Sequence, residues 1–136
     1  MRVLIDTNVL ISASLFAGSV PYKAYMKAVT SPFHGIICDQ IIDEMKKVYS
    51  LKFPHKVKEL NKFFMTAMGD IEIVNVPYDG EQYPGAFLIR DEKDRGIYEA
   101  AVKYKADIIL TGDKDFLESG VDKPLCVSPS DFLENY

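Results

Sequence analysis

The sequence predicts an α/β fold in which helices cover both faces of a central parallel sheet of about five strands. Apolar runs of strand length recur along the chain, and they are continuous more than alternating, which is typical of strands buried on both faces. Amphipathic helical patterns lie between these runs, and strands that alternate with helices imply right-handed crossover connections. The chain has 136 residues, a length at which one hydrophobic core suffices, so we expect a single domain over residues 1–136.

The expected strands are rich in Val and Ile, and they cover residues 2–5, 35–38, 71–76, 107–110 and 125–127. Helical patterns, in which apolar residues recur every three or four positions, fall within residues 21–29, 40–49, 57–68 and 97–104. Ser128 and Pro129 suit the cap and first turn of a terminal helix over residues 128–133. The segment 77–85 contains Pro and Gly and is typical of a loop.

The composition is that of an ordinary soluble domain, with 48% hydrophobic and 26% charged residues. No apolar run approaches the ~20 residues of a membrane span, and the N-terminus lacks the apolar stretch of a signal peptide. Cys38 and Cys126 are isolated in the sequence, so we expect two small buried side chains in a reducing compartment, not a disulfide or a zinc site. We therefore expect a cytoplasmic protein that does not associate with membranes.

Basic residues are concentrated in the segment from Lys46 to Lys62. It contains six lysines against one acid, Glu59, although the chain as a whole has a net charge of −4. A basic surface on an acidic body suits the steering of a polyanion towards a separate site. A solvated pair of lysine-rich helices is the alternative, and charge alone favours it.

Two acidic residues follow expected strands. Asp6 is the first residue after the run 2–5, and Asp113 lies three residues after Leu110, with Gly112 allowing a sharp exit from the strand. Ligands of parallel sheets bind beyond the carboxyl ends of the strands, so both carboxylates are expected at one edge. Either acid could instead cap a helix. Thr7 or Asn8 could equally cap the first helix, so a cap does not require Asp6.

Helix phase separates the remaining acids. Glu44 lies roughly 100° from the centre of the apolar stripe of residues 41–49, on its border, whereas Asp43 lies roughly 160° away and should face water. Asp94 lies roughly 40° from the centre of the stripe of residues 97–104, which points it inward. The alternative for Asp94 is a capping box with Asp91 as the N-cap.

Four short motifs together resemble the PIN-domain ribonucleases, in particular the VapC-like toxin components of bacterial and archaeal toxin–antitoxin pairs. The motifs are Ile5-Asp6-Thr7-Asn8-Val9-Leu10-Ile11-Ser12, Asp43-Glu44-Met45, Arg90-Asp91-Glu92-Lys93-Asp94 and Thr111-Gly112-Asp113-Lys114-Asp115-Phe116. The resemblance runs from residue 2 to the terminal segment 128–133. The first and last motifs are fairly specific in this order and spacing, and either alone is weak.

The resemblance implies a three-layer Rossmann-like PIN fold, cleavage of RNA, and a site for one or two Mg²⁺ or Mn²⁺ ions. By position, the acidic metal-binding and catalytic set falls on Asp6, Glu44, Asp94 and Asp113, with Asp115 as an accessory ligand. Asn8 and Thr111 would support the site, and Lys46, Lys47 and Lys52 are the candidates for contact with RNA phosphates. The implied partners are an RNA substrate, a cognate antitoxin and a second copy of the chain in a homodimer.

One departure from the family concerns Asp94. The family often continues after this acid with Asn or a further acid and then an apolar residue, whereas Arg95 and Gly96 follow here. Glycine destabilises a helix by about 1 kcal/mol relative to alanine, so it weakens the start of the helix that positions Asp94.

The clustering of four carboxylates would itself favour the binding of a cation. Four clustered carboxylates repel one another, so in the absence of metal at least one should have a raised pKa and hold a proton. Hard cations remove that repulsion, because oxygen ligands suit Mg²⁺. His34 and His55 have no partner at the spacing of metal ligands, so neither is a candidate.

Three alternatives to a toxin ribonuclease remain open or can be weighed from the sequence. A phosphatase of the haloacid dehalogenase type would require a second Asp at position 8, which is Asn8. A non-catalytic RNA- or protein-binding module on the same fold would be favoured if Asp94 pointed away from the other acids. Within the nucleases, the sequence does not separate a toxin from a housekeeping RNA-processing enzyme.

Overall fold

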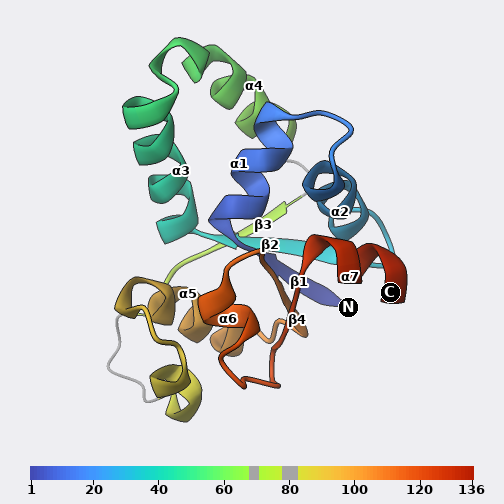
Figure 1. Ribbon diagram of the computed structural model, residues 1–136, viewed down its shortest axis with the longest axis vertical. Helices are drawn as coiled ribbons and strands as arrows, with labels where there is room; N and C mark the ends of the chain where they lie inside the picture. The colour runs from blue at the N-terminus through green and yellow to red at the C-terminus, as the bar shows by residue number, and fades with distance from the viewer. Residues whose placement is uncertain (68–70, 78–82) are drawn as a thin grey trace.

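The computed structural model describes residues 1–67, 71–77 and 83–136 (Figure 1). The strands are β1 (Arg2–Ile5), β2 (His34–Cys38), β3 (Ile71–Val74), β4 (Ile108–Leu110) and β5 (Leu125–Val127). The helices are α1 (Thr7–Leu15), α2 (Val20–Ala28), α3 (Asp39–Lys52), α4 (Val57–Ala67), α5 (Glu92–Lys103), α6 (Lys114–Leu117) and α7 (Pro129–Asn135), with short 3₁₀ helices η1 (Pro54–Lys56) and η2 (Pro84–Leu88). The strands pair in parallel in the order β3-β2-β1-β4-β5, which confirms the predicted fold class.

Strand β1 is the centre of the sheet. Leu4 is in register with Ile36 of β2 on one side and with Ile109 of β4 on the other. All three side chains are fully buried. Because helices cover both faces of the sheet, the inner strands bury successive residues, which explains their continuous apolar runs.

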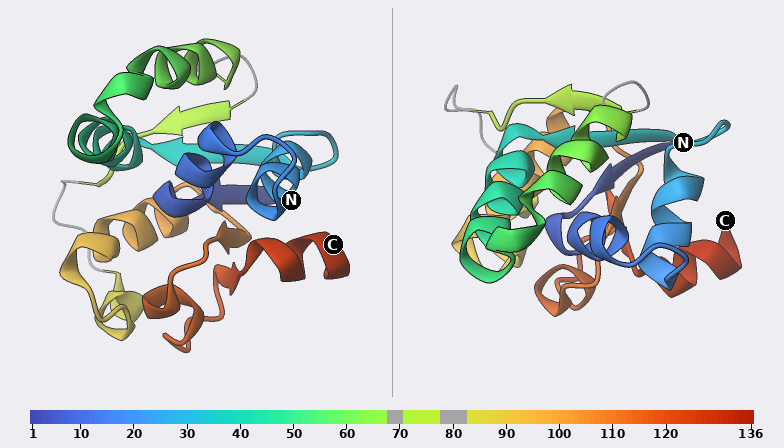
Figure 2. Two further views of the ribbon diagram at one scale, coloured as in Figure 1. Left: turned by 45° about the horizontal axis from the view of Figure 1, so that its top comes forward. Right: turned by 90° about the horizontal axis from the view of Figure 1, so that it is seen from above.

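Helices α1 to α4 lie on one side of the sheet, and α5 and α6 lie on the other (Figure 1). Helix α7 returns beside α2, with which it packs. The left view of Figure 2 shows the arrows of β2 and β3 pointing away from the two chain termini. The carboxyl ends of the strands therefore form the edge remote from the termini, and α1, α3 and α6 begin there.

Two differences from the predicted elements concern strand β3 and helix α1. Strand β3 ends at Val74, not at position 76, because the backbone N–H of Val76 donates to the Asp39 carboxylate (3.0 Å). Helix α1 begins directly after β1 and runs to Leu15, where the sequence indicated only a helix cap. It packs Val9 and Leu10 into the core. Met68, the last residue of the predicted stripe 57–68, and most of the predicted loop 77–85 lie outside the described residues.

The described part of the chain contains no helix that is long and apolar enough to cross a membrane. Cys38 is buried as expected, whereas Cys126 is only partly buried, and both are free thiols.

Shortening Leu4 to alanine should strongly destabilise the fold, because the residue is buried between the neighbours of the central strand. We expect Leu4→Ala to lower the free energy of unfolding by about 3 kcal/mol, measured by urea denaturation. Leu51→Ala is the matched control, since Leu51 is 72% exposed on α3, and we expect a change below about 0.5 kcal/mol. Equal effects of the two substitutions would contradict the assignment of β1 as the centre of the core.

Candidate metal centre

Asp6 joins the ends of the two central strands. It is 4% exposed and is the N-cap of α1, where one carboxylate oxygen accepts a hydrogen bond from the Thr7 backbone N–H (2.8 Å). The other oxygen accepts from the Thr111 hydroxyl (2.8 Å), directly after β4. Asp6 is thus itself the cap, a role that the sequence left equally open to Thr7 or Asn8. The hydrogen bonds from Thr7 and Thr111 therefore hold both oxygens of the Asp6 carboxylate in place.

The turn between β4 and α6 places Asp113 beside Asp6. The Thr111 hydroxyl accepts a hydrogen bond from the Asp113 backbone N–H (3.0 Å), and the Asn8 side-chain carbonyl accepts one from the Gly112 N–H (3.2 Å). Asp113 caps the short helix α6 by accepting from the Asp115 N–H (2.9 Å). Asn8 and Thr111 therefore hold this turn against the start of α1, and Asp113 lies close enough to Asp6 for its charge to affect the Asp6 pKa.

Glu44 reaches the same edge from α3. One of its carboxylate oxygens accepts from the Thr7 hydroxyl (2.5 Å) and the other from the Gln40 side-chain amide (2.9 Å). Asp43, the preceding residue, is exposed, as the helix phase predicted.

Asp94 approaches from the opposite side of the sheet, in the first turn of α5. Asp91 is the N-cap of this helix, so the predicted cap is confirmed. Asp94 is 9% exposed, and its Oδ2 is buried without a hydrogen-bond partner among the described residues. Burial raises the pKa of Asp94, and the negative charges of Asp6 and Asp113 lie close enough to raise it further. Asp94 therefore points towards the other acids.

Of the predicted metal ligands, Asp94 and Asp115 belong, together with Asp91, to the group of described acids that lies close enough to share one cation, and Asp6, Glu44 and Asp113 lie outside that group. Asp91, Asp94 and Asp115 each offer a carboxylate oxygen within 4.8 Å of the others. Asp115 is partly buried, and Arg90 donates to one of its oxygens through both Nε (2.9 Å) and Nη2 (2.6 Å). From the sequence, Asp91 was predicted only as a cap. The bonds from Thr7, Gln40 and Arg90 to the acids were not predicted, because they depend on side-chain conformations that spacing does not reveal.

Burial of like charges raises two pKa values at this edge. Burial first, and then the negative charges of Asp6 and Asp113, raise the pKa of Asp94 to about 8. Burial raises the pKa of Asp6 to about 6, although hydrogen bonds from Thr111 and Thr7 oppose this rise. At neutral pH and without a cation, Asp94 therefore holds a proton, as expected of crowded carboxylates.

The residues at this edge fit a hard divalent cation. The acidic side chains at this edge offer carboxylate oxygens as ligand atoms, and Mg²⁺ and Mn²⁺ favour such oxygen ligands. A buried carboxylate oxygen without a hydrogen bond is costly to desolvate, and within residues 1–67, 71–77 and 83–136 the Oδ2 of Asp94 is such an atom. A cation at this position would satisfy it.

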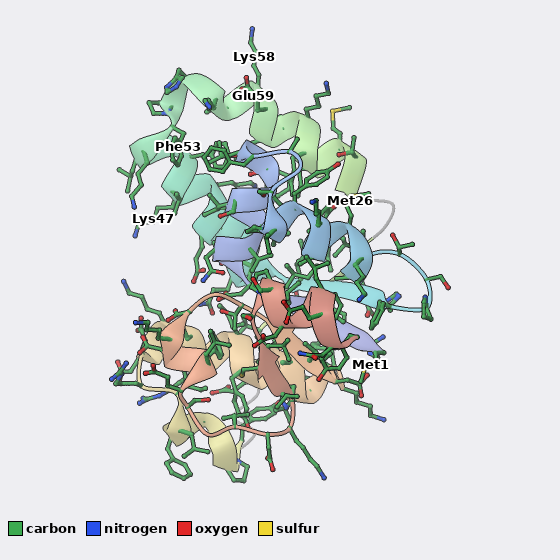
Figure 3. All side chains as sticks on the ribbon, turned by 45° about the vertical axis from the view of Figure 1, so that its right-hand side comes forward. Met1, Met26, Lys47, Phe53, Lys58 and Glu59 are labelled. Atoms are coloured by element: carbon green, nitrogen blue, oxygen red, sulfur yellow. The ribbon has the colours of Figure 1, made fainter. Side chains whose placement is uncertain are left out.

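The three lysines predicted to contact phosphates are exposed on α3, the helix that carries Glu44. Lys47 and Lys58 extend outward from α3 and α4 (Figure 3). Lys52 lies eight positions after Glu44, about 12 Å along the helix axis. The basic surface and the acidic edge thus share one helix, and Lys47 lies three positions after Glu44.

Comparisons with known proteins agree with this geometry. The family model described as PIN domain matches residues 2–115. The match covers most of the sequence, so the chain belongs to the PIN-domain family. A sequence search of the curated proteins found no match.

Two solved structures have a similar fold. One is VapBC2 from Rickettsia felis bound to a DNA fragment from the promoter, with 15% identity, a TM-score of 0.67, and coverage of 94% of this chain and 98% of that chain. The other is VapC20 from Mycobacterium tuberculosis, a toxin that cleaves the sarcin–ricin loop, with 14% identity, a TM-score of 0.62, and coverage of 87% and 95%. The chain therefore has the VapC-like PIN fold that the sequence motifs predicted.

Replacing Asp94 with asparagine should change how stability depends on pH when no metal is present. The folded-state pKa of Asp94 is about 8, above its ordinary value of 3.8. Its contribution to stability is therefore full below about pH 4 and is lost as the pH rises towards 8. We expect Asp94→Asn to gain at least about 2 kcal/mol over wild type between pH 4.5 and pH 8.5, since one unit of pKa shift corresponds to about 1.4 kcal/mol, measured by urea denaturation in EDTA.

The exposed neighbour of Glu44 provides the control for this experiment. Asp43→Asn removes an equal charge near the same edge without removing a buried carboxyl. We expect its stability difference from wild type to stay nearly constant with pH. A pH-independent difference for Asp94→Asn would contradict the raised pKa.

Proposed function

We propose that this protein is a metal-dependent endoribonuclease, which hydrolyses RNA phosphodiester bonds at the acidic edge of its sheet and is the toxin of a toxin–antitoxin pair. The observation that carries this proposal is the position of Asp94. It is buried beside Asp6 and Asp113, and one of its carboxylate oxygens has no hydrogen-bond partner in the described part of the chain. The alternative of a non-catalytic module would be favoured if Asp94 pointed away from the other acids, and Asp94 points towards them.

In this proposal Asp6, Glu44, Asp94 and Asp113 hold one or two Mg²⁺ or Mn²⁺ ions, with Asp115 as an accessory ligand. A bound divalent cation supplies positive charge that makes water more acidic and stabilises charge developing on the phosphate. The carboxylates orient the attacking water, and Asp94, which holds a proton at neutral pH without a cation, would lose that proton when a cation binds.

The neighbouring polar residues keep these carboxylates in place. Thr111 fixes Asp6, and Thr7 fixes Glu44. Asn8 holds the turn before Asp113. Such partners restrict the rotamers of ligand side chains, so less order has to be imposed when a cation binds.

The toxin assignment rests on the fold shared with VapBC2 and VapC20 and on the motifs that first suggested it. We further propose an antitoxin partner, a homodimer and a cytoplasmic location. Expression in a bacterial host tests the toxin role. Growth arrest by wild type but not by Asp6→Asn supports a toxin, and the absence of arrest together with RNA cleavage in vitro supports a housekeeping nuclease.

Asp6→Asn should abolish metal-dependent cleavage, because it removes charge from the carboxylate that links β1 to β4. We expect the cleavage rate of a mixture of structured RNAs with Mn²⁺ to fall by at least about 100-fold. Asp43→Asn should retain the rate within about twofold, since Asp43 is exposed away from the site. Cleavage that survives Asp6→Asn, or that continues in EDTA, would rule out the carboxylate mechanism.

Reversing the charge of Lys46, Lys47 and Lys52 should weaken RNA binding and flatten its dependence on salt. Each lost phosphate contact lowers the slope of log K against log salt by about 0.7 for a single strand, so we expect a total change of about 2. Binding is measured in the Asp6→Asn background, which prevents cleavage.

Three exposed lysines from other elements supply the control for this charge reversal. Lys23, Lys105 and Lys123 lie outside the basic segment, and changing them to Glu alters the net charge equally. An unchanged salt slope in the α3 variant, or an equal change in the control, would show that the basic segment is only a solvated surface.

A further inference from the structure

Gln40 connects two helices that supply acids to the proposed metal site. Its side-chain amide nitrogen donates to Glu44 Oε1 (2.9 Å), one turn along α3, and to the backbone carbonyl of Lys93 in α5 (2.5 Å). That carbonyl belongs to the peptide group that joins Lys93 to Asp94. One amide group therefore bonds to an acidic side chain of α3 and to the backbone beside an acid of α5.

The position of Gly96 makes room for this connection. A Cβ atom at position 96 would lie 2.6 Å from the Gln40 side-chain oxygen and 3.1 Å from Val76 Cγ1. The first distance is far shorter than ordinary contacts, and the Gln40 amide, as the end of a flexible side chain, would have to move. Alanine would favour the helix by about 1 kcal/mol in propensity. The glycine therefore preserves the position of Gln40 at the expense of local helix stability.

Figure 1 shows why such a connection matters, since the end of α3 nearest the sheet lies above α5, and these helices cover opposite faces. The relative position of Glu44 and Asp94 therefore depends on contacts across the sheet edge. Gln40 makes one of these contacts, and its side chain is uncharged and only partly buried.

We propose that Gln40 is a positioning residue, which sets the distance between Glu44 and Asp94 for cation binding, and that Gly96 is present to accommodate it. This inference rests on the proposed metal site. Partners that orient ligand side chains commonly contribute 10- to 100-fold to metal affinity, so roughly a tenfold effect is expected here.

The test measures Mn²⁺ affinity by calorimetry, together with the thermal unfolding midpoint of each variant. Gln40→Met keeps the length of the side chain and removes both hydrogen bonds, so the Mn²⁺ dissociation constant should rise about tenfold. Gly96→Ala should raise it similarly while leaving the unfolding midpoint unchanged or higher, because alanine favours the helix. A purely structural role for Gln40 would not produce weaker binding in a variant that is equally or more stable.

Two further variants complete the comparison. The double variant Gln40→Met, Gly96→Ala should bind Mn²⁺ about as weakly as either single variant, because both substitutions remove the same pair of bonds. Ser50→Ala is the matched control, since it removes a side-chain hydrogen bond within α3 alone, to the Lys46 carbonyl, and should not change affinity. Wild-type affinity in both Gln40→Met and Gly96→Ala would overturn this inference but not the proposed function. Failure of the wild-type protein to bind Mn²⁺ would overturn both.

Discussion

The parallel register of β1 against β4 is the constraint on which the site depends. Ile5 is opposite Leu110, and the Asp6 backbone N–H donates to the Leu110 carbonyl (2.9 Å). The residues that follow each strand must then meet, and the Thr111 hydroxyl bonds to the Asp6 carboxylate. A one-residue change of register would exchange the two faces of the strand and separate these groups. The hydrophobic pattern that buries β1 thereby also fixes the first corner of the acidic site.

Gathering carboxylates at one edge opposes folding. Burial without a cation raises the pKa of both Asp94 and Asp6, which means that their charged forms are less favourable in the folded state than in the unfolded chain. Hydrogen bonds from Thr7 and Thr111 reduce this cost for Asp6, whereas the Oδ2 of Asp94 has no partner among the residues that the structure describes. The carboxylate at the end of β1 is thus well supplied with hydrogen bonds, whereas the carboxylate on α5 is poorly supplied.

The features that the sequence could predict are those with a local signal. Strand burial appears as continuous apolar runs, and helix phase correctly placed Asp43 outward and Asp94 inward. The bond from Gln40 to the Lys93 carbonyl and the bonds from Arg90 to Asp115 had no such signal, because each joins residues far apart in the sequence. The end of β3 was predicted two residues too late for the same reason, since the Asp39 carboxylate takes the Val76 N–H away from the sheet.

Gly96 shows how a local weakness can have a tertiary explanation. In the sequence, Gly96 is a departure from the family pattern that weakens the start of the helix carrying Asp94. In the structure, the missing Cβ leaves the space occupied by the Gln40 amide, which bonds to the backbone beside that same acid. A residue that disagrees with local propensity is most readily retained where a site needs it. Gly96 therefore lowers the intrinsic stability of α5, but it allows Gln40 of α3 to bond to the first turn of α5. Helix propensity alone thus underestimates how firmly Asp94 is held.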